Sequence, residues 1–132
     1  MTEQCNHDPP LQVVPQLRVA DMHRSIAFYH DVLGLSPTVL DPPDAPVFAS
    51  LEAGDVTLFL VADEDMPSVK GAPAVHGAGV RIFFEVDDAE GVYNRLVESD
   101  VPVAGPPVRN EEADYVEFRL TDPDGYEICV YS

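Results

Sequence analysis

The side chains with the most chemical potential in this sequence lie on two segments whose alternating pattern is typical of strands. In residues 80–86, Arg81 and Glu85 alternate with apolar residues and share one face with Phe83. In residues 127–131, Glu127 and Cys129 share a face in the same way. A guanidinium at Arg81 suits a ligand's carboxylate or phosphate-like group, and it equally suits an internal ion pair with Glu85 or Glu127. The sequence leaves both roles open.

Cys129 and the histidines are the other groups that catalysis could use. A cysteine nucleophile needs a base and a positive neighbour that lowers its pKa. Arg81 is a suitable neighbour, but no histidine is placed to act as the base. We therefore expect Cys129 to be a small buried hydrophobe. The four histidines are scattered along the chain, and no pair has the spacing of metal ligands.

The elements that position these groups occur twice. Residues 13–35 (VVPQLRVADMHRSIAFYHDVLGL) and 79–101 (GVRIFFEVDDAEGVYNRLVESDV) each give a short strand, an Asp and an amphipathic helix. A unit of about sixty residues that repeats in tandem buries its sheet only beside its copy. We divide the chain into a tail (1–10), a first module (11–62), a linker (63–79) and a second module (80–132).

In the first module, the pattern predicts strands at 11–19, 37–40, 47–51 and 56–61. Pro15 lacks a backbone donor, so the first strand should be an edge or should meet its neighbour only at its far end. The helix should begin at residue 20 or 21 and end at Gly34, where a left-handed residue is favoured. By strand alternation, Val14, Gln16 and Arg18 face one way and Leu17 and Val19 the other.

In the second module, the pattern predicts strands at 80–86, 101–103, 115–120 and 127–131, with a tight turn at 122–125. Asp87 and Glu90 have the spacing of a capping box that starts the helix, and Asp100 stands where Gly34 stood. The proline-containing loops 41–46 and 106–114 occupy matching places in the two modules. We expect them to form stiff rims.

Composition and charge exclude several classes of partner. The 24 acidic and 7 basic residues give a net charge of −17, which opposes binding to nucleic acid or to an anionic membrane. No apolar run is long enough for a membrane helix, and because the first ten residues lack a basic and an apolar region, we do not expect them to be a signal peptide. Two cysteines make no disulfide framework, so we expect a cytoplasmic protein. The acidic charge indicates either a solvation coat suited to high salt, which its even spread favours, or attraction of a cationic ligand.

Three segments resemble the vicinal oxygen chelate superfamily, which includes glyoxalase I, extradiol dioxygenases and the fosfomycin- and bleomycin-resistance proteins. They are VADMHRSIAFYHDVLGL (19–35), FFEVDDAEGVYNRLVES (83–99) and FRLTDPDGYEICVY (118–131). The resemblance implies an α+β fold in which two tandem βαβββ modules form a cup-shaped sheet with helices on its outer face. It also implies a homodimer.

The metal enzymes of this superfamily place ligands at four equivalent points. Here the resemblance puts those points at Val14, Phe59, Arg81 and Cys129, and none is a usual ligand of the family. The nearest substitutes are Gln16, Glu85 and Glu127, which would make a shifted, carboxylate-rich site. The resemblance therefore favours the metal-free, ligand-binding branch represented by the bleomycin-resistance proteins, which the opening VVPQLRVAD also resembles.

The sequence thus predicts a protein that binds a small organic ligand in the cup with no cofactor. The predicted ligand-binding residues are Val14, Gln16, Arg18, Phe59, Arg81, Phe83, Glu85, Glu127 and Cys129, and no metal ligand is predicted. Phe59 and Phe83 either stack on a planar ligand or fill the interior. Catalysis is left open but not favoured. The alternative is a lyase, isomerase or dioxygenase that holds a divalent metal through a non-standard ligand set.

Overall fold

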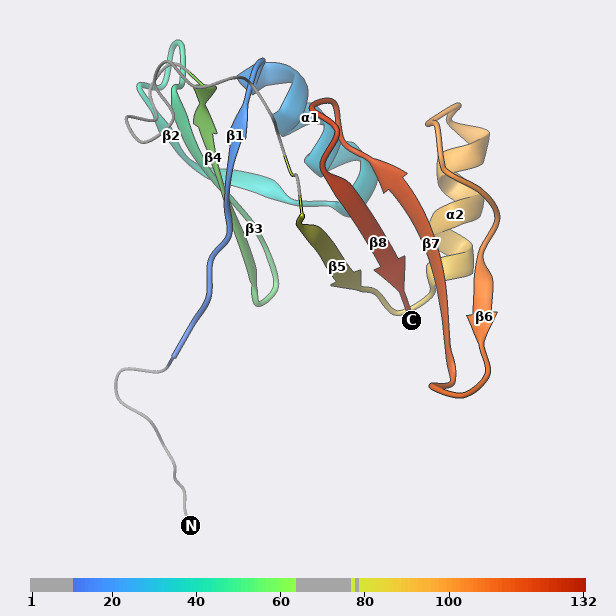
Figure 1. The fold of residues 1–132 in the computed structure, drawn as a ribbon. Helices are drawn as coiled ribbons and strands as arrows, with labels where there is room; N and C mark the ends of the chain where they lie inside the picture. Colours follow the sequence, from blue (N-terminus) through green and yellow to red (C-terminus); the bar gives the residue numbers. More distant parts are fainter. Residues whose placement is uncertain (1–10, 64–76, 78) are drawn as a thin grey trace.

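The computed structural model describes residues 11–63, 77 and 79–132 as two βαβββ modules (Figure 1). The tail and nearly all of the predicted linker lie outside the described residues. The first module consists of β1 (Gln16–Val19), α1 (Met22–Leu33), β2 (Ser36–Asp41), β3 (Phe48–Ala53) and β4 (Val56–Ala62). The second consists of β5 (Arg81–Glu85), α2 (Ala89–Glu98), β6 (Val108–Asn110), β7 (Tyr115–Thr121) and β8 (Glu127–Tyr131). The predicted α+β fold of two repeated modules is confirmed.

Each module folds into a four-stranded sheet, in the orders β1-β4-β3-β2 and β5-β8-β7-β6. The first strand of each module pairs in parallel with the last, and the remaining pairs are antiparallel. β1 is an edge strand and begins only at Gln16, so the predicted strand at 11–19 was too long. Pro15 has no N–H to donate, and only its carbonyl meets β4, accepting from the Phe59 N–H at 3.0 Å.

Both helices begin at an aspartate. The Asp21 side chain accepts a hydrogen bond from the Arg24 N–H at 3.1 Å, and α1 ends at Gly34 with φ = 76°, both as predicted. α2 is capped by Asp88, which accepts from the Gly91 N–H, so the predicted capping box was placed one residue early. The reason is that Val86 is still hydrogen-bonded to β8: its N–H donates to the Tyr131 carbonyl at 2.8 Å, so the helix begins one residue later.

Two expectations for the second module were wrong. Residues 101–103 form no strand. Val101 and Val103 pack against the core instead, and the strand that hydrogen-bonds to β7 lies further along the chain. That strand is β6 (Val108–Asn110), within the segment 106–114 that was predicted as a loop forming a stiff rim. The Asp100 backbone does adopt the left-handed conformation, with φ = 59°.

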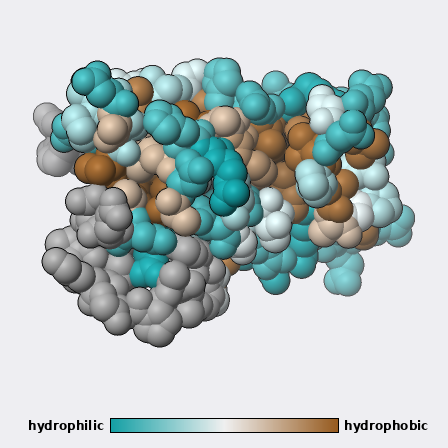
Figure 2. All heavy atoms as spheres, turned by 90° about the horizontal axis from the view of Figure 1, so that it is seen from above, coloured by the Kyte–Doolittle hydropathy of each residue, from teal (hydrophilic) through white to brown (hydrophobic). Residues whose placement is uncertain are grey.

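Strand alternation divides each sheet into two faces. One face packs on the helices and forms the core; in the first sheet it holds Leu17, Val19, Ala49, Leu51, Leu58 and Leu60. The second sheet adds Phe118, Leu120, Ile128 and Val130 to the same cluster. We name the opposite side, turned away from this core, the open face. Seen from above, apolar residues gather over the half of the molecule that holds the second module (Figure 2).

The turn between β7 and β8 joins the two modules. In Figure 1, α1 lies between the two sheets and reaches this turn. The Tyr29 hydroxyl of α1 donates to the buried Asp122 carboxylate at 2.7 Å. The Tyr126 hydroxyl donates to the Arg18 carbonyl at 2.8 Å and accepts from the Arg18 N–H at 3.1 Å. Asp124 accepts from the Ala20 N–H at 3.0 Å. We name this set of contacts the inter-module lock.

No helix in the described part of the chain is long and apolar enough to cross a membrane.

Candidate functional site

The open face of the first sheet is built by β1, β4 and β3. Gln16 is exposed at its edge and pairs in register with Phe59. The Phe59 ring packs against Phe48 at a centroid distance of 5.2 Å, which favours its role in filling the interior. Arg18 is buried and its Nε lies 3.3 Å from an Asp63 carboxylate oxygen. Val14 precedes β1 and is half-buried.

The open face of the second sheet carries the charged residues that the sequence singled out. Arg81 is in register with Glu127, and its Nε donates to the Glu127 carboxylate at 2.9 Å. The structure therefore contains the internal ion pair that was one of the two alternatives for Arg81. Phe83 is in register with Cys129 and is 49% exposed. Its ring contacts Tyr131 edge-on at 6.1 Å.

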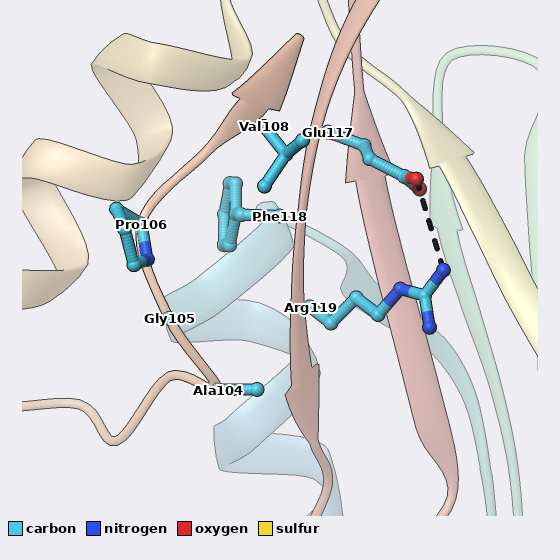
Figure 3. A pocket seen from close by; sticks show the side chains of 7 residues that line it. All are labelled: Ala104, Gly105, Pro106, Val108, Glu117, Phe118 and Arg119. Carbon is cyan, nitrogen blue, oxygen red and sulfur yellow. Dashed lines mark ion pairs between the residues drawn. The ribbon is translucent and has the colours of Figure 1, made fainter. Parts of the chain in front are cut away.

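β7 adds two charged residues to this face that the sequence analysis missed. Arg119 is in register with Cys129, and Glu117 with Tyr131. Figure 3 shows Arg119 and Glu117 extending together to one side of β7 while Phe118 extends to the other. The Arg119 guanidinium lies 3.7 Å from Glu117 and 3.6 Å from Glu127. The alternation in the predicted strand 115–120 was the signal that could have placed both residues on this face.

Cys129 sits beneath these side chains with no exposed surface. Burial raises the pKa of its thiol, because desolvation and the nearby Glu117 and Glu127 together outweigh the opposing effect of Arg119 and Arg81. A thiol that stays protonated is a poor nucleophile. The arrangement therefore supports the expectation that Cys129 acts as a small hydrophobe.

The donor set at the four equivalent points does not fit a divalent metal. Val14 and Phe59 have no donor atom in their side chains, and Arg81 brings a positive charge that is held by Glu127. The fourth residue, Cys129, is a single buried thiol, and one donor side chain among the four points does not make a site for a divalent ion. Within residues 11–63, 77 and 79–132, no group of three or more His, Cys, Asp or Glu side chains is placed to hold an ion.

A cavity of about 410 Å³ lies where the two modules meet. Figure 1 shows the β3–β4 hairpin beside β5 at this place. The cavity is lined by Val13, Pro15, Asp55, Val56, Thr57 and Leu58 from the first module and by Ile82, Phe83, Phe84 and Glu85 from the second. We name it the junction cavity. A smaller cavity of about 180 Å³ shares Val13, Asp55 and Thr57 with it and adds Val14.

The predicted site residues thus fall into three groups. Phe83 and Glu85 line the junction cavity, and Val14 lines the cavity that adjoins it. Arg81, Glu127 and Cys129 lie together on the open face of the second sheet, while Gln16, Arg18 and Phe59 lie on that of the first. A further cavity of about 330 Å³ between β7 and residues 104–108 (Figure 3) contains none of the predicted residues.

Comparisons with known proteins agree with the fold. The family model described as Glyoxalase/Bleomycin resistance protein/Dioxygenase superfamily matches residues 11–130. A lactoylglutathione lyase structure from Agrobacterium tumefaciens is 21% identical, with a TM-score of 0.70 over 93% of this chain and 94% of that one. A virulence protein from Salmonella typhimurium is 20% identical, with a TM-score of 0.71 over 92% and 95%.

A glyoxalase/bleomycin resistance protein/dioxygenase structure from Nocardioides is 22% identical, with a TM-score of 0.72 over 92% of this chain and 82% of that one. Likeness at this level of identity shows the fold alone. A search of curated proteins gives no match.

Proposed function

Because the chain belongs to the Glyoxalase/Bleomycin resistance protein/Dioxygenase superfamily, we propose that it binds a small organic molecule at the junction cavity and the adjoining open face, without a metal ion. Membership alone does not decide the function, since one fold hosts many chemistries. The proposal therefore rests on the residues that line the site.

The observation that carries the proposal is the replacement of the metal donors. The two points in the first module are apolar, and the two in the second are an ion-paired arginine and a single buried thiol. A divalent ion that polarises two oxygens of a substrate needs several converging donor side chains. The chain's own residues offer a ligand apolar walls and a few charged anchors instead.

The junction cavity supports ligand binding by its size and its lining. Its volume of about 410 Å³ lies within the roughly 300–1,000 Å³ of small-molecule sites. Phe83 offers an exposed aromatic ring, and Glu85 offers a charged group beside it.

The alternative, a metal enzyme with a shifted ligand set, would need Gln16, Glu85 and Glu127 as ligands. Glu127 already lies 2.9 Å from Arg81 and 3.6 Å from Arg119. Two guanidinium groups at those distances repel a divalent cation from that carboxylate. No contact among the described residues favours this alternative over ligand binding.

A fragment screen on chelator-treated protein tests the proposal. Binding is followed by ¹H–¹⁵N chemical shifts, and we expect hits to move the amide signals of Thr57, Phe83 and Glu85 without added metal. Phe83→Ala should weaken these hits, whereas Val39→Ala, which removes an equally exposed apolar side chain on β2, should not. Hits that bind only after Zn²⁺, Ni²⁺ or Mn²⁺ is restored would contradict the proposal.

We also propose that the protein acts in the cytoplasm as a homodimer, which rests on the cysteine content and on the family resemblance. Light scattering coupled to gel filtration tests the dimer. A mass of one chain at micromolar concentration would count against it.

A further inference from the structure

We propose that the junction cavity selects a small organic cation with an apolar, ring-bearing body. This inference rests on the proposed function and deepens it by naming the chemical class of the ligand. It follows from three features of the cavity: the sign of its charges, the partners of those charges and the nature of its walls.

The charged groups of the cavity are all of one sign. Asp55 and Glu85 are the ionisable residues among the described side chains that line it, and that lining contains no Arg, Lys or His. They come from different modules, so carboxylates stand on both sides of the junction. An anionic ligand would meet like charge here, whereas a cation would meet opposite charge.

The basic residues of the same open face are engaged elsewhere. Arg81 is hydrogen-bonded to Glu127, and Arg119 lies between Glu117 and Glu127. Among the ion pairs between described residues, none includes Asp55 or Glu85. Both carboxylates are exposed and therefore available to a ligand that enters the cavity.

The walls of the cavity are apolar and accessible. Val13, Val56 and Phe83 belong to the small set of large hydrophobic residues that the described chain exposes, and all three line this cavity. Exposed apolar residues that gather in one hollow mark a binding site better than single ones do. The Phe83 ring adds a negative quadrupole face, which attracts an organic cation within about 6 Å.

The two carboxylates should make similar, moderate contributions. Because both are solvent-exposed, their attraction for a cation is screened by water and salt. Replacing either by its amide should lower affinity about two- to five-fold, and replacing both should lower it about ten-fold. The overall charge of −17 adds a long-range attraction that every charge-neutralising variant reduces slightly, so a distant control is needed.

Three probes that share a phenyl ring test the inference: benzyltrimethylammonium, benzyl alcohol and phenylacetate. Dissociation constants come from ¹H–¹⁵N titrations of the full chain at low salt and again at 0.5 M KCl. We expect millimolar binding of benzyltrimethylammonium that moves the signals of Val56, Thr57, Phe83 and Glu85. Binding of the alcohol should be weaker, that of phenylacetate weakest, and the preference should shrink in high salt.

The variants are Asp55→Asn, Glu85→Gln and their combination, with Glu112→Gln as the control. Glu112 is an exposed carboxylate in the turn between β6 and β7, far along the chain from the cavity residues. We expect the three cavity variants to lose affinity for the cation and not for benzyl alcohol. The control should keep both affinities.

The outcomes separate this inference from the proposed function. Equal or tighter binding of phenylacetate or benzyl alcohol at the cavity signals overturns the cation preference and leaves a ligand-binding cavity in place. Equal losses in Glu112→Gln and Glu85→Gln also overturn it, since the effect is then one of net charge. If no probe moves the cavity signals at tens of millimolar, the inference is wrong, whereas the proposed function is tested separately by the fragment screen: it fails if the hits bind away from Thr57, Phe83 and Glu85 or need a metal.

Discussion

Tyr29→Phe removes one oxygen from the inter-module lock and should destabilise the protein by more than a surface change would. The Tyr29 hydroxyl donates to Asp122 at 2.7 Å, and that carboxylate is only 4% exposed. A hydrogen bond to a charged group contributes about 1.5–3 kcal/mol, and the variant leaves a buried acceptor without this donor. We therefore expect a loss of roughly 2–3 kcal/mol in the free energy of unfolding at pH 7.

The loss should depend on pH in a defined direction. Burial raises the pKa of Asp122, and the hydrogen bond from Tyr29 opposes that rise. A carboxyl whose pKa is higher in the folded state than in the unfolded state favours folding at low pH, and this contribution is lost as the pH rises through the folded-state pKa. Removing the Tyr29 hydroxyl raises that pKa further. The difference between wild type and Tyr29→Phe should therefore be largest at pH 7 and should narrow as Asp122 becomes protonated.

Urea unfolding followed by circular dichroism at a series of pH values from 7 down to 3 measures both effects. Tyr93→Phe is the matched control: its ring meets Phe118 edge-on at 5.6 Å, and its hydroxyl makes no hydrogen bond within the described residues. We expect the control to change stability by less than about 0.5 kcal/mol. The reasoning is refuted if the two variants lose the same free energy, or if the loss in Tyr29→Phe does not change anywhere across the pH series.

Three further predictions follow from the site and the surface. The melting temperature should rise as KCl approaches molar levels, because screening relieves the repulsion within a chain of net charge −17; a flat or falling curve would contradict the salt-adapted coat. Arg81→Met should leave the melting temperature nearly unchanged, because the Arg81–Glu127 pair is largely exposed and Arg119 stays near Glu127. The same variant should tighten binding of benzyltrimethylammonium. A large drop in stability or weaker cation binding would refute the view that Arg81 only forms a surface ion pair. Cys129 should resist iodoacetamide at pH 8 until the protein is unfolded, because the thiol is buried and its pKa is raised; rapid alkylation of Cys129 in folded protein, detected by peptide mass spectrometry, would show that it is accessible.

The elements of the fold were predictable because their signals are local. Asp21 and Gly34 bound the first helix by capping chemistry that belongs to single residues. β8 was predicted with the bounds that the structure gives it, because its alternation is regular and a tight turn precedes it. Pro15 limited β1 because proline has no backbone N–H to donate, which is also a property of a single residue.

The errors lie where pairing with a distant segment decides the structure. β6 consists of three exposed residues, so it carries no pattern of burial, and it exists because Val108 to Asn110 pair with Tyr115 to Glu117. Val101 and Val103 looked like a strand but contribute to the core without ladder partners. In the same way, the turn at 122–125 was predicted, but its bond to Tyr29, 93 residues away along the chain, was not.

The same distinction between local patterns and long-range contacts applies to the candidate site. Alternation placed Arg81, Phe83 and Glu85 on one face, and the register of β5 with β8 bears that out. The choice between the two roles of Arg81 depended on the 2.9 Å contact with Glu127, which no pattern in the sequence specifies. The junction cavity also depends on how the β3–β4 hairpin meets β5, an arrangement of two modules that only the folded chain defines.

Elemental analysis of protein purified without chelators tests the central claim, binding without a metal, most directly. With a valine, a phenylalanine, an ion-paired arginine and a single buried thiol at the four equivalent points, we predict no stoichiometric Ni, Zn, Mn or Fe, whether the chain is analysed as purified or after dialysis against each ion. One tightly held transition metal per chain would contradict the account and move the protein to the metal-dependent enzymes of its superfamily.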